Sequence, residues 1–238
     1  LATLAIVDEK LPLETASTLW KALQDGLISP ISEVYKFYQA EGNSESVIGN
    51  GNESEQLPIT HDQLPKYKFL HDRVQQAAYS LIPENQKRST HLKIGQLLLK
   101  NTPEAEREER IFDIVNHLNV GLELITHEAE REQLAQLNLV AGKKAKAATA
   151  YSAAVEYFNI GRKLLTAKSW QNQYELTLAL HTEAAEAAYL SGDFERMEEL
   201  ASVVESCAKM LLDKVKVYEV QMQAYMAQQK LQEALNTG

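Results

Sequence analysis

The sequence predicts a mainly α-helical protein made of two modules, and three observations carry this prediction. The chain has 238 residues, of which 45% are hydrophobic, so it exceeds the usual size of one compact domain and can bury a substantial core. Gly and Pro thin out after Pro103, where Ala, Leu, Glu, Gln and Lys dominate. Apolar residues then recur at helical spacing to the end of the chain. We place the two modules at residues 1–82 and 83–238.

The first module is predicted to mix helices and strands. The end of a helix is expected at residues 1–7, a second helix at 12–25, and paired strands at 34–38 and 67–70. Residues 41–66 between the strands form an acidic insertion, whose first part contains four Glu but no Lys or Arg up to residue 58, and we expect it to be disordered. Two short helices, a two-stranded hairpin and a further helix are the order of a winged helix with a long acidic wing.

The second module is predicted to be helix after helix. The expected helices cover residues 84–100, 104–124, 128–148, 151–165, 174–190, 194–211 and 214–229. A search for internal repeats is the next step, because chains of this kind often consist of stacked helical hairpins.

The tetratricopeptide template fits this module at its small and aromatic positions. Its first copy is Gly142, Tyr151, Ala154, Phe158 and Gly161, its second is Ala185, Phe194, Met197 and Ala201, and its third is Met222, Leu231 and Ala234. Ala154 and Met197 are 43 residues apart, and Met197 and Ala234 are 37 apart. A regular repeat has about 34 residues, so these are irregular, tetratricopeptide-like repeats. A non-repetitive helical bundle is the alternative.

The junction at residues 67–83, YKFLHDRVQQAAYSLIP, leads from a strand into a helix and carries His71 and Asp72 at the joint. On the residues alone, Asp72 is a helix cap whose carboxylate accepts backbone N–H groups, and His71 fills the turn. A functional role for these two residues requires a resemblance to a known family.

That resemblance exists. FLHDRVQQAAYSLIP, together with residues 1–30 before it and HLKIGQLLL and IFDIVNHLNVGLELI after it, resembles the region that follows the nucleotide-binding module in STAND-class signalling ATPases. The likeness is strongest to large multi-sensor kinases of the bacterial, especially cyanobacterial, type. In these kinases a serine/threonine kinase domain precedes an AAA-like ATPase, a winged helix, helical repeats, and GAF and histidine-kinase modules.

The resemblance implies a nucleotide-dependent switch. In STAND proteins the winged helix carries a hydrophobic-His-Asp motif, whose histidine reaches the diphosphate of ADP in the neighbouring ATPase and holds the resting state closed. Leu70, His71 and Asp72 match this motif. His71 is then an ADP phosphate contact in the longer parent, with Asp72 as helix cap or motif partner. ATP or ADP is expected in the adjacent domain, no cofactor in this fragment, and assembly upon activation.

The sequence contains no constellation of catalytic residues. It has no GxxxxGK[ST] phosphate loop, no Gly-rich loop, HRD or DFG of a protein kinase, and no phosphoacceptor context around a histidine. His61, His91, His117, His127 and His181 lack the spacing of metal ligands, so each is interpreted as a solvated or core residue. We therefore expect a non-catalytic fragment without a metal site.

Charge and composition limit the partners. The net charge of −9 and the pI near 5.3 disfavour nucleic acid and anionic membranes, and the helix at 12–25 itself carries a net −1. No apolar run approaches the roughly 20 residues of a membrane span, and no signal peptide opens the chain. Cys207 lies in a helical pattern and is expected to be a small buried hydrophobe, which suits a reducing, cytoplasmic setting.

A basic cluster at Lys143, Lys144 and Lys146 is interpreted as one rim of a helix, or as a docking point for an acidic partner. Leu1 is not Met and the last helical pattern has no partner, so we expect a piece of a longer protein. The predicted function is that of a regulatory segment of a multidomain signalling kinase, which couples an adjacent NTPase module to output domains and binds protein partners through its repeats. A STAND-type transcriptional regulator with a DNA-binding winged helix is the alternative.

Overall fold

The computed structural model describes residues 28–30, 67–69, 72–80 and 82–237. The chain divides into two compact units, Leu1–Pro83 and Glu84–Gly238, which are treated separately below. The described residues are mainly helical, as the composition predicts.

The first unit contains a two-stranded antiparallel sheet of β1 (Ile28–Pro30) and β2 (Tyr67–Phe69), followed by the helix α3 (Asp72–Ser80). Ile28 pairs with Phe69 and Pro30 with Tyr67. The described partner of β2 is therefore Ile28–Pro30. The partner predicted at 34–38 lies outside the described residues, as do the helices predicted at 1–7 and 12–25 and the insertion at 41–66. A three-residue strand is too short to show the alternation by which strands are recognised in a sequence, and its proline lacks a backbone donor.

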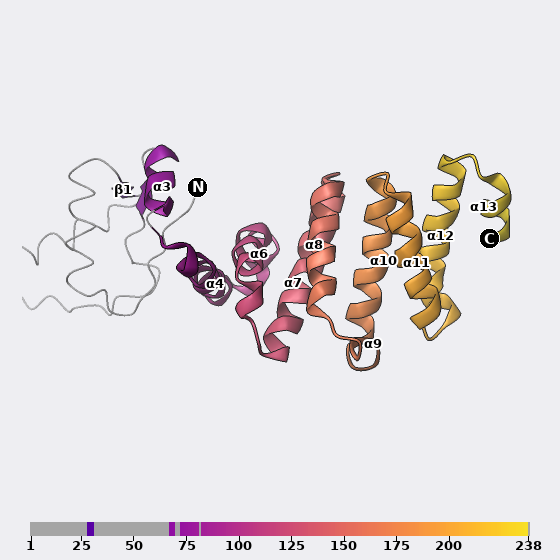
Figure 1. Ribbon diagram of the computed structural model, residues 1–238, viewed down its shortest axis with the longest axis horizontal. Helices are drawn as coiled ribbons and strands as arrows, with labels where there is room; N and C mark the ends of the chain where they lie inside the picture. The colour runs from indigo at the N-terminus through magenta and orange to yellow at the C-terminus, as the bar shows by residue number, and fades with distance from the viewer. Residues whose placement is uncertain (1–27, 31–66, 70–71, 81, 238) are drawn as a thin grey trace, which may run out of the picture. The chain divides into compact units, whose positions relative to one another are not determined.

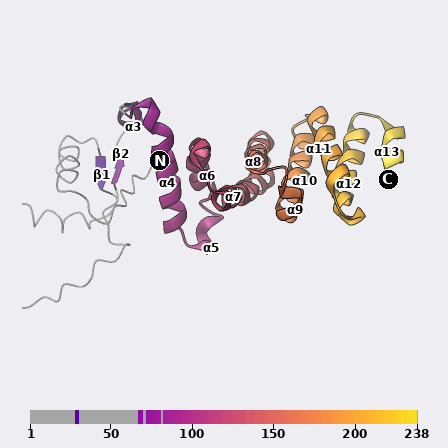
Figure 2. The same ribbon diagram turned by 60° about the horizontal axis from the view of Figure 1, so that its bottom comes forward.

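The second unit is entirely helical in its described residues. Its helices are α4 (Glu84–Asn101), α5 (Glu104–Arg107), α6 (Ile111–Val120), the 3₁₀ helix η2 (Leu122–Leu124), α7 (Glu128–Ala147), α8 (Tyr151–Leu164), α9 (Ser169–Asn172), α10 (Tyr174–Leu190), α11 (Phe194–Cys207), α12 (Leu211–Ala227) and α13 (Leu231–Thr237). Figures 1 and 2 show these helices following one another in a row.

The single helix predicted at 104–124 is wrong, because the structure divides this segment into α5, α6 and η2. Arg110, with φ −97° and ψ 13°, departs from helical geometry before α6. α6 buries Ile111, Ile114, Val115 and Leu118, whereas α5 buries no residue. The charged first turn thus lacks the packing that would hold it in line with the apolar helix after it, since helical stability in proteins comes largely from a packed face.

The helix predicted at 194–211 also ends earlier than expected, at Cys207, and Leu211 instead begins α12. Cys207 is exposed, so its expected burial is wrong. The buried face of α11 consists of Met197, Leu200, Ala201 and Val204 and stops one turn before the cysteine. Apolar residues continue at helical spacing to residue 211, and the predicted helix was therefore extended beyond the actual end at Cys207.

The same turn joins three pairs of successive helices: α7 to α8, α10 to α11, and α12 to α13. Its central residue has a left-handed backbone with φ of 60° at Thr149, 84° at Gly192 and 61° at Gln229. In each turn the backbone N–H groups of three consecutive residues donate to carbonyl groups four, three and five residues earlier, in that order. These turns recur at the same intervals as the sequence repeats, so the three hairpins share one construction.

Small residues let these helices approach closely. A Cβ atom added at Gly142 of α7 would lie 2.3 Å from the ring of Phe158 on α8, and one added at Gly161 of α8 would lie 2.7 Å from Leu180 on α10. Phe158 and Leu180 are both fully buried. The glycines are therefore required by the ring and the leucine that occupy the space of a side chain.

Exchanging residues in the turns tests their shared construction. Thr149→Gly is expected to raise the free energy of unfolding by about 1 kcal/mol, because a β-branched residue is strained in the left-handed region. Gly192→Ala is expected to lower it by about 1 kcal/mol, purely through backbone strain, since an added Cβ meets no atom within 4 Å. Urea denaturation measures both values. A change of the same sign in both variants, or no change in either, would contradict the shared construction.

Candidate interaction surface

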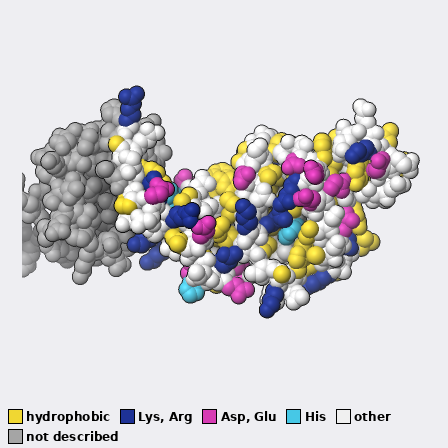
Figure 3. Space-filling model, viewed as in Figure 1, with side chains coloured by type: hydrophobic (Ala, Val, Ile, Leu, Met, Phe, Trp, Pro, Cys, Tyr) yellow, Lys and Arg dark blue, Asp and Glu magenta, His cyan; other side chains and the backbone are white. Residues whose placement is uncertain are grey.

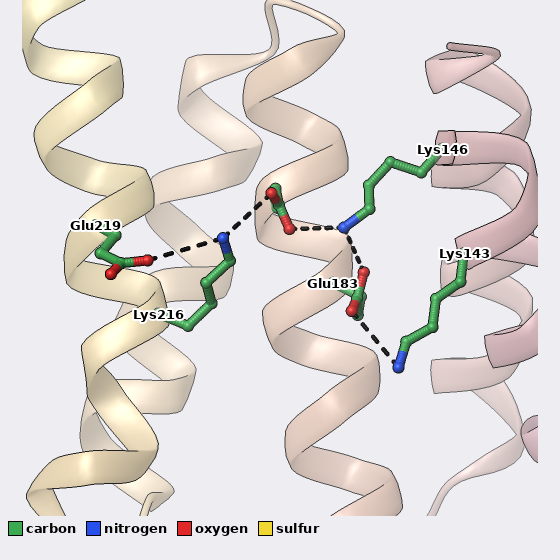
Figure 4. Close-up of polar contacts among 6 residues, drawn as sticks. Lys143, Lys146, Glu183, Lys216 and Glu219 are labelled. Carbon is green, nitrogen blue, oxygen red and sulfur yellow. Dashed lines mark hydrogen bonds and ion pairs between the residues drawn. The ribbon is translucent and has the colours of Figure 1, made fainter. Parts of the chain in front are cut away.

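A network of ion pairs connects α7, α10 and α12, the first helices of the three hairpins (Figure 4). At its centre the Lys146 ammonium lies 2.6 Å from carboxylate oxygens of both Glu183 and Glu186. Glu186 also forms an ion pair with Lys216 of α12, whose ammonium nitrogen lies 3.3 Å from a carboxylate oxygen of Glu186. One carboxylate of α10 thereby joins the helix before it to the helix after it.

Two further contacts extend the network at its ends. Lys143 lies 3.6 Å from Glu183, and Lys216 lies 3.8 Å from Glu219 on its own helix. The side chain of Lys146 is only 19% exposed, whereas those of Lys143, Lys216 and Glu219 are about half exposed. The centre of the network therefore acts as a structural connection between hairpins, and its ends are accessible to a partner.

The electrostatics of the centre favour both charged forms. Burial lowers the pKa of Lys146, but hydrogen bonds and charge from Glu183 and Glu186 outweigh it and leave this pKa raised. Burial raises the pKa of Glu186, but the hydrogen bond from Lys146 and the charges of Lys146 and Lys216 leave it lowered. The lowered pKa of Glu186 contributes stability above pH 4.5, and this contribution is lost as the pH falls through the folded-state pKa.

The three lysines of the basic cluster predicted from the sequence contact two different parts of the helical unit. Lys143 and Lys146, three residues apart, face α10, where Glu183 and Glu186 have the same spacing. Lys144 points elsewhere and donates to the backbone carbonyls of Glu108 and Glu109 at 2.6 and 3.0 Å. The prediction of a single basic rim missed this division, although the matching i,i+3 spacing of opposite charges in successive repeats is a signal that could have revealed it.

The side chains of the predicted His-Asp site, His71 and Asp72, lie outside the described part of the chain. Asp72 is the first residue of α3, at the helix start where a cap was predicted, and its side chain is outside the description. His71 lies outside the described residues. The nucleotide role of both residues stays a prediction.

Two histidines for which the sequence predicted no shared site, His91 of α4 and His117 of α6, are in contact. The Nδ1 atoms of His91 and His117 are 3.0 Å apart, and their ring centroids are 4.9 Å apart. Burial and the neighbouring His91 lower the pKa of His117, while Asp113 opposes this shift. In the part of the chain that the structure describes, no group of three or more His, Cys, Asp or Glu side chains is arranged to hold a metal ion. The contact joins residues 26 positions apart on different helices, so sequence spacing could not reveal it.

His181 is the core histidine of α10. Its Nδ1 atom lies 2.8 Å from the Thr177 carbonyl, and its ring lies 5.1 Å from that of Trp170. Burial lowers the pKa of His181 to about 4, and the charges of Arg162 and Arg196 act in the same direction against the hydrogen bond to Thr177. His181 is thus a neutral residue of the folded protein at physiological pH.

The surface of the helical unit carries both signs of charge. On the face drawn in Figure 3, Lys and Arg side chains are interspersed with Asp and Glu, and apolar side chains lie between them. None of the helices in the described ranges is both long and apolar enough to cross a lipid bilayer.

The sequence of the chain is similar to that of a known signalling protein. Hybrid signal transduction histidine kinase G of Dictyostelium discoideum is 30% identical to it over an alignment of 195 residues, and the match covers 69% of this chain and 6% of that protein. No protein-family model and no solved structure matches the chain. The chain spans only a small part of its relative, so the similarity links it to a signal-transduction protein and leaves the activity of the whole protein open to proposal.

Removing the central charge of the network should destabilise the helical unit. Lys146→Met keeps an aliphatic stem but leaves Glu183 and Glu186 close together and only about one-fifth exposed. We expect a loss of about 1–2 kcal/mol in the free energy of unfolding. Lys143→Met, at the half-exposed end, is the matched control and should cost less than about 0.5 kcal/mol. Urea denaturation at neutral pH measures both, and equal losses would contradict a central role for Lys146.

The buried His181 should make stability depend on pH. Its folded pKa of about 4 lies below the ordinary 6.5, so the unfolded chain takes up the proton first. Stability is therefore complete above pH 6.5 and falls as the pH decreases towards 4, by about 3 kcal/mol at most. His181→Asn, which does not titrate, should remove this part of the profile. Parallel profiles of the two proteins between pH 6.5 and 4 would show that His181 does not contribute.

Proposed function

We propose that this chain is a non-catalytic coupling and interaction segment of a multidomain signal-transduction kinase. The observation that carries the proposal is the ion-pair network, because it ties three hairpins of one construction into a continuous row. A row of stacked hairpins presents an extended surface to proteins and passes a displacement of one hairpin to the next. The similarity to a hybrid histidine kinase supports the signalling context.

The finer architecture in this proposal is a tetratricopeptide-like array preceded by a winged-helix module. The close contacts at Gly142 and Gly161 and the recurring turns support the array. The antiparallel pair of β1 and β2, followed directly by α3, supports the winged helix, since a two-stranded hairpin beside a helix is part of that module.

Coupling would start at the nucleotide. We assign His71 the role of contacting the phosphates of ADP in an adjacent STAND-type or AAA-type ATPase domain of the parent, with Asp72 holding the start of α3. A histidine can donate a hydrogen bond to a phosphate oxygen, and such a contact favours the domain arrangement in which it forms. The helical unit then transmits that arrangement to output domains.

Two substitutions in the full-length parent separate nucleotide sensing from transmission. His71→Ala should weaken ADP binding by about tenfold, the loss expected for one charge-assisted hydrogen bond, as measured by calorimetry. Lys146→Met should leave ADP affinity unchanged but reduce the difference in kinase output between the ADP-bound and ATP-bound states. His61→Ala, another histidine of the first unit, is the control.

An unchanged ADP affinity of the His71→Ala parent would remove the switch role. An unchanged nucleotide dependence of output in the Lys146→Met parent, despite the expected loss of stability, would remove the coupling role of the network. If both results were obtained, the proposed function would have no support left in these residues.

A further inference from the structure

Two surface features of the helical unit lack a partner within the described residues, and they are complementary in charge and in apolar character. One is an open groove of about 430 Å³ beside α5, α6 and the first half of α7. The other is the apolar segment at residues 210–212, where α11 gives way to α12.

The groove combines an apolar floor with an acidic rim. Leu137 and Val140, both partly buried, contribute apolar surface above the fully buried Ile111, and Glu104, Glu108 and Glu132 line the edge. Glu132 accepts a hydrogen bond from Gln173 at 2.9 Å. Within the described part of the chain, neither Glu104 nor Glu108 has a cation within 4 Å of its carboxylate. The one cationic side chain lining the groove, Arg107, donates to the Thr102 carbonyl. The rim therefore attracts a positively charged partner.

The segment at residues 210–212 has the complementary character. Met210, Leu211 and Leu212 are 59%, 72% and 78% exposed, which is unusual for three consecutive large apolar side chains. Lys209 and Lys214 flank them. Lys209 lies over the ring of Tyr174, and Lys214 donates to the backbone carbonyl of Glu205, so no carboxylate neutralises either ammonium group in the described residues. With Asp213 included, residues 209–214 carry a net positive charge.

We propose that residues 210–212 of one copy of this chain dock in the groove of a second copy, so that copies associate head to tail. Leu211 and Leu212 cover Leu137 and Val140, while Lys209 and Lys214 approach Glu104 and Glu108. The groove volume is within the range of pockets that hold small ligands, about 300–1,000 Å³, and suffices for these side chains. Burial of the leucines supplies the attraction, and the charges set the orientation.

The contact uses different surfaces on the two copies, which gives it a property that a symmetric contact lacks. After a dimer has formed, one copy still has a free groove and the other still has a free apolar segment, so association continues or closes into a ring. A copy with a defective groove can still dock its apolar segment into a copy with a defective segment. Two variants that fail alone should therefore associate with each other.

Sedimentation velocity of the chain over a range of concentrations tests this inference. The unmodified chain should shift from monomer to larger species as its concentration rises. Leu211→Ser combined with Leu212→Ser, and separately Glu104→Lys combined with Glu108→Lys, should each raise the dissociation constant about tenfold or more. The control is Leu235→Ser, at a leucine that is 76% exposed on α13, and it should leave association unchanged.

An equimolar mixture of the two double variants should form a heterodimer and nothing larger, which is the decisive result. A chain that stays monomeric at every concentration, a mixture that stays monomeric, or an equal loss of association in Leu235→Ser would each overturn the inference. Circular dichroism of each variant verifies that its helices are intact. These results are independent of the proposed coupling function, because a monomeric chain would still give the same outcomes in the nucleotide and kinase assays.

Discussion

Close packing of α10 against the helices on both sides is the constraint on which the rest of the helical unit depends. α10 contacts α7 and α8 before it and α11 and α12 after it. It achieves this with small buried residues, Ala184, Ala185, Ala187 and Ala188, which let neighbouring backbones approach. The same proximity brings Glu183 and Glu186 within reach of lysines on two other helices. A larger side chain at the alanines would therefore disturb apolar packing and the ion pairs together.

The ion pairs explain why the charges of α10 can be half-buried. A carboxylate removed from water loses hydration, and only close cations and hydrogen bonds compensate for that loss. Glu186 meets this requirement from both sides, through Lys146 and Lys216. Each lysine belongs to a different hairpin, so the compensation holds only while the hairpins keep their spacing. The network thus makes the spacing between repeats an electrostatic as well as a steric property.

Local sequence patterns were sufficient for most helices but not for contacts between helices. Periodic apolar residues predicted α4, α7, α8 and α10 to within one residue at their ends, and α7, α8 and α10 each bury a face along their length. The apolar periodicity failed to predict the break within residues 104–124, where a charged turn precedes an apolar helix. It also failed at Cys207, because apolar residues at helical spacing continue beyond the end of α11. The contact between His91 and His117 and the groove beside α5 arise from three-dimensional packing, which no local spacing records. Of the candidate site, the lysines at 143 and 146 were visible in the sequence, but their carboxylate partners on α10 were not recognised.

The groove and the network share α7, and this places them in one mechanical unit. Gln136 lines the groove and Lys143 belongs to the network, and their spacing of seven residues puts both on the same side of the helix. The groove is formed by the contact of α7 with α5 and α6, and the network by its proximity to α10. A partner that moved α7 relative to both α6 and α10 would also change the distance between Lys146 and Glu183. Such a movement would link occupation of the groove to the strength of the ion pairs through one helix, and linkage of this kind is reciprocal.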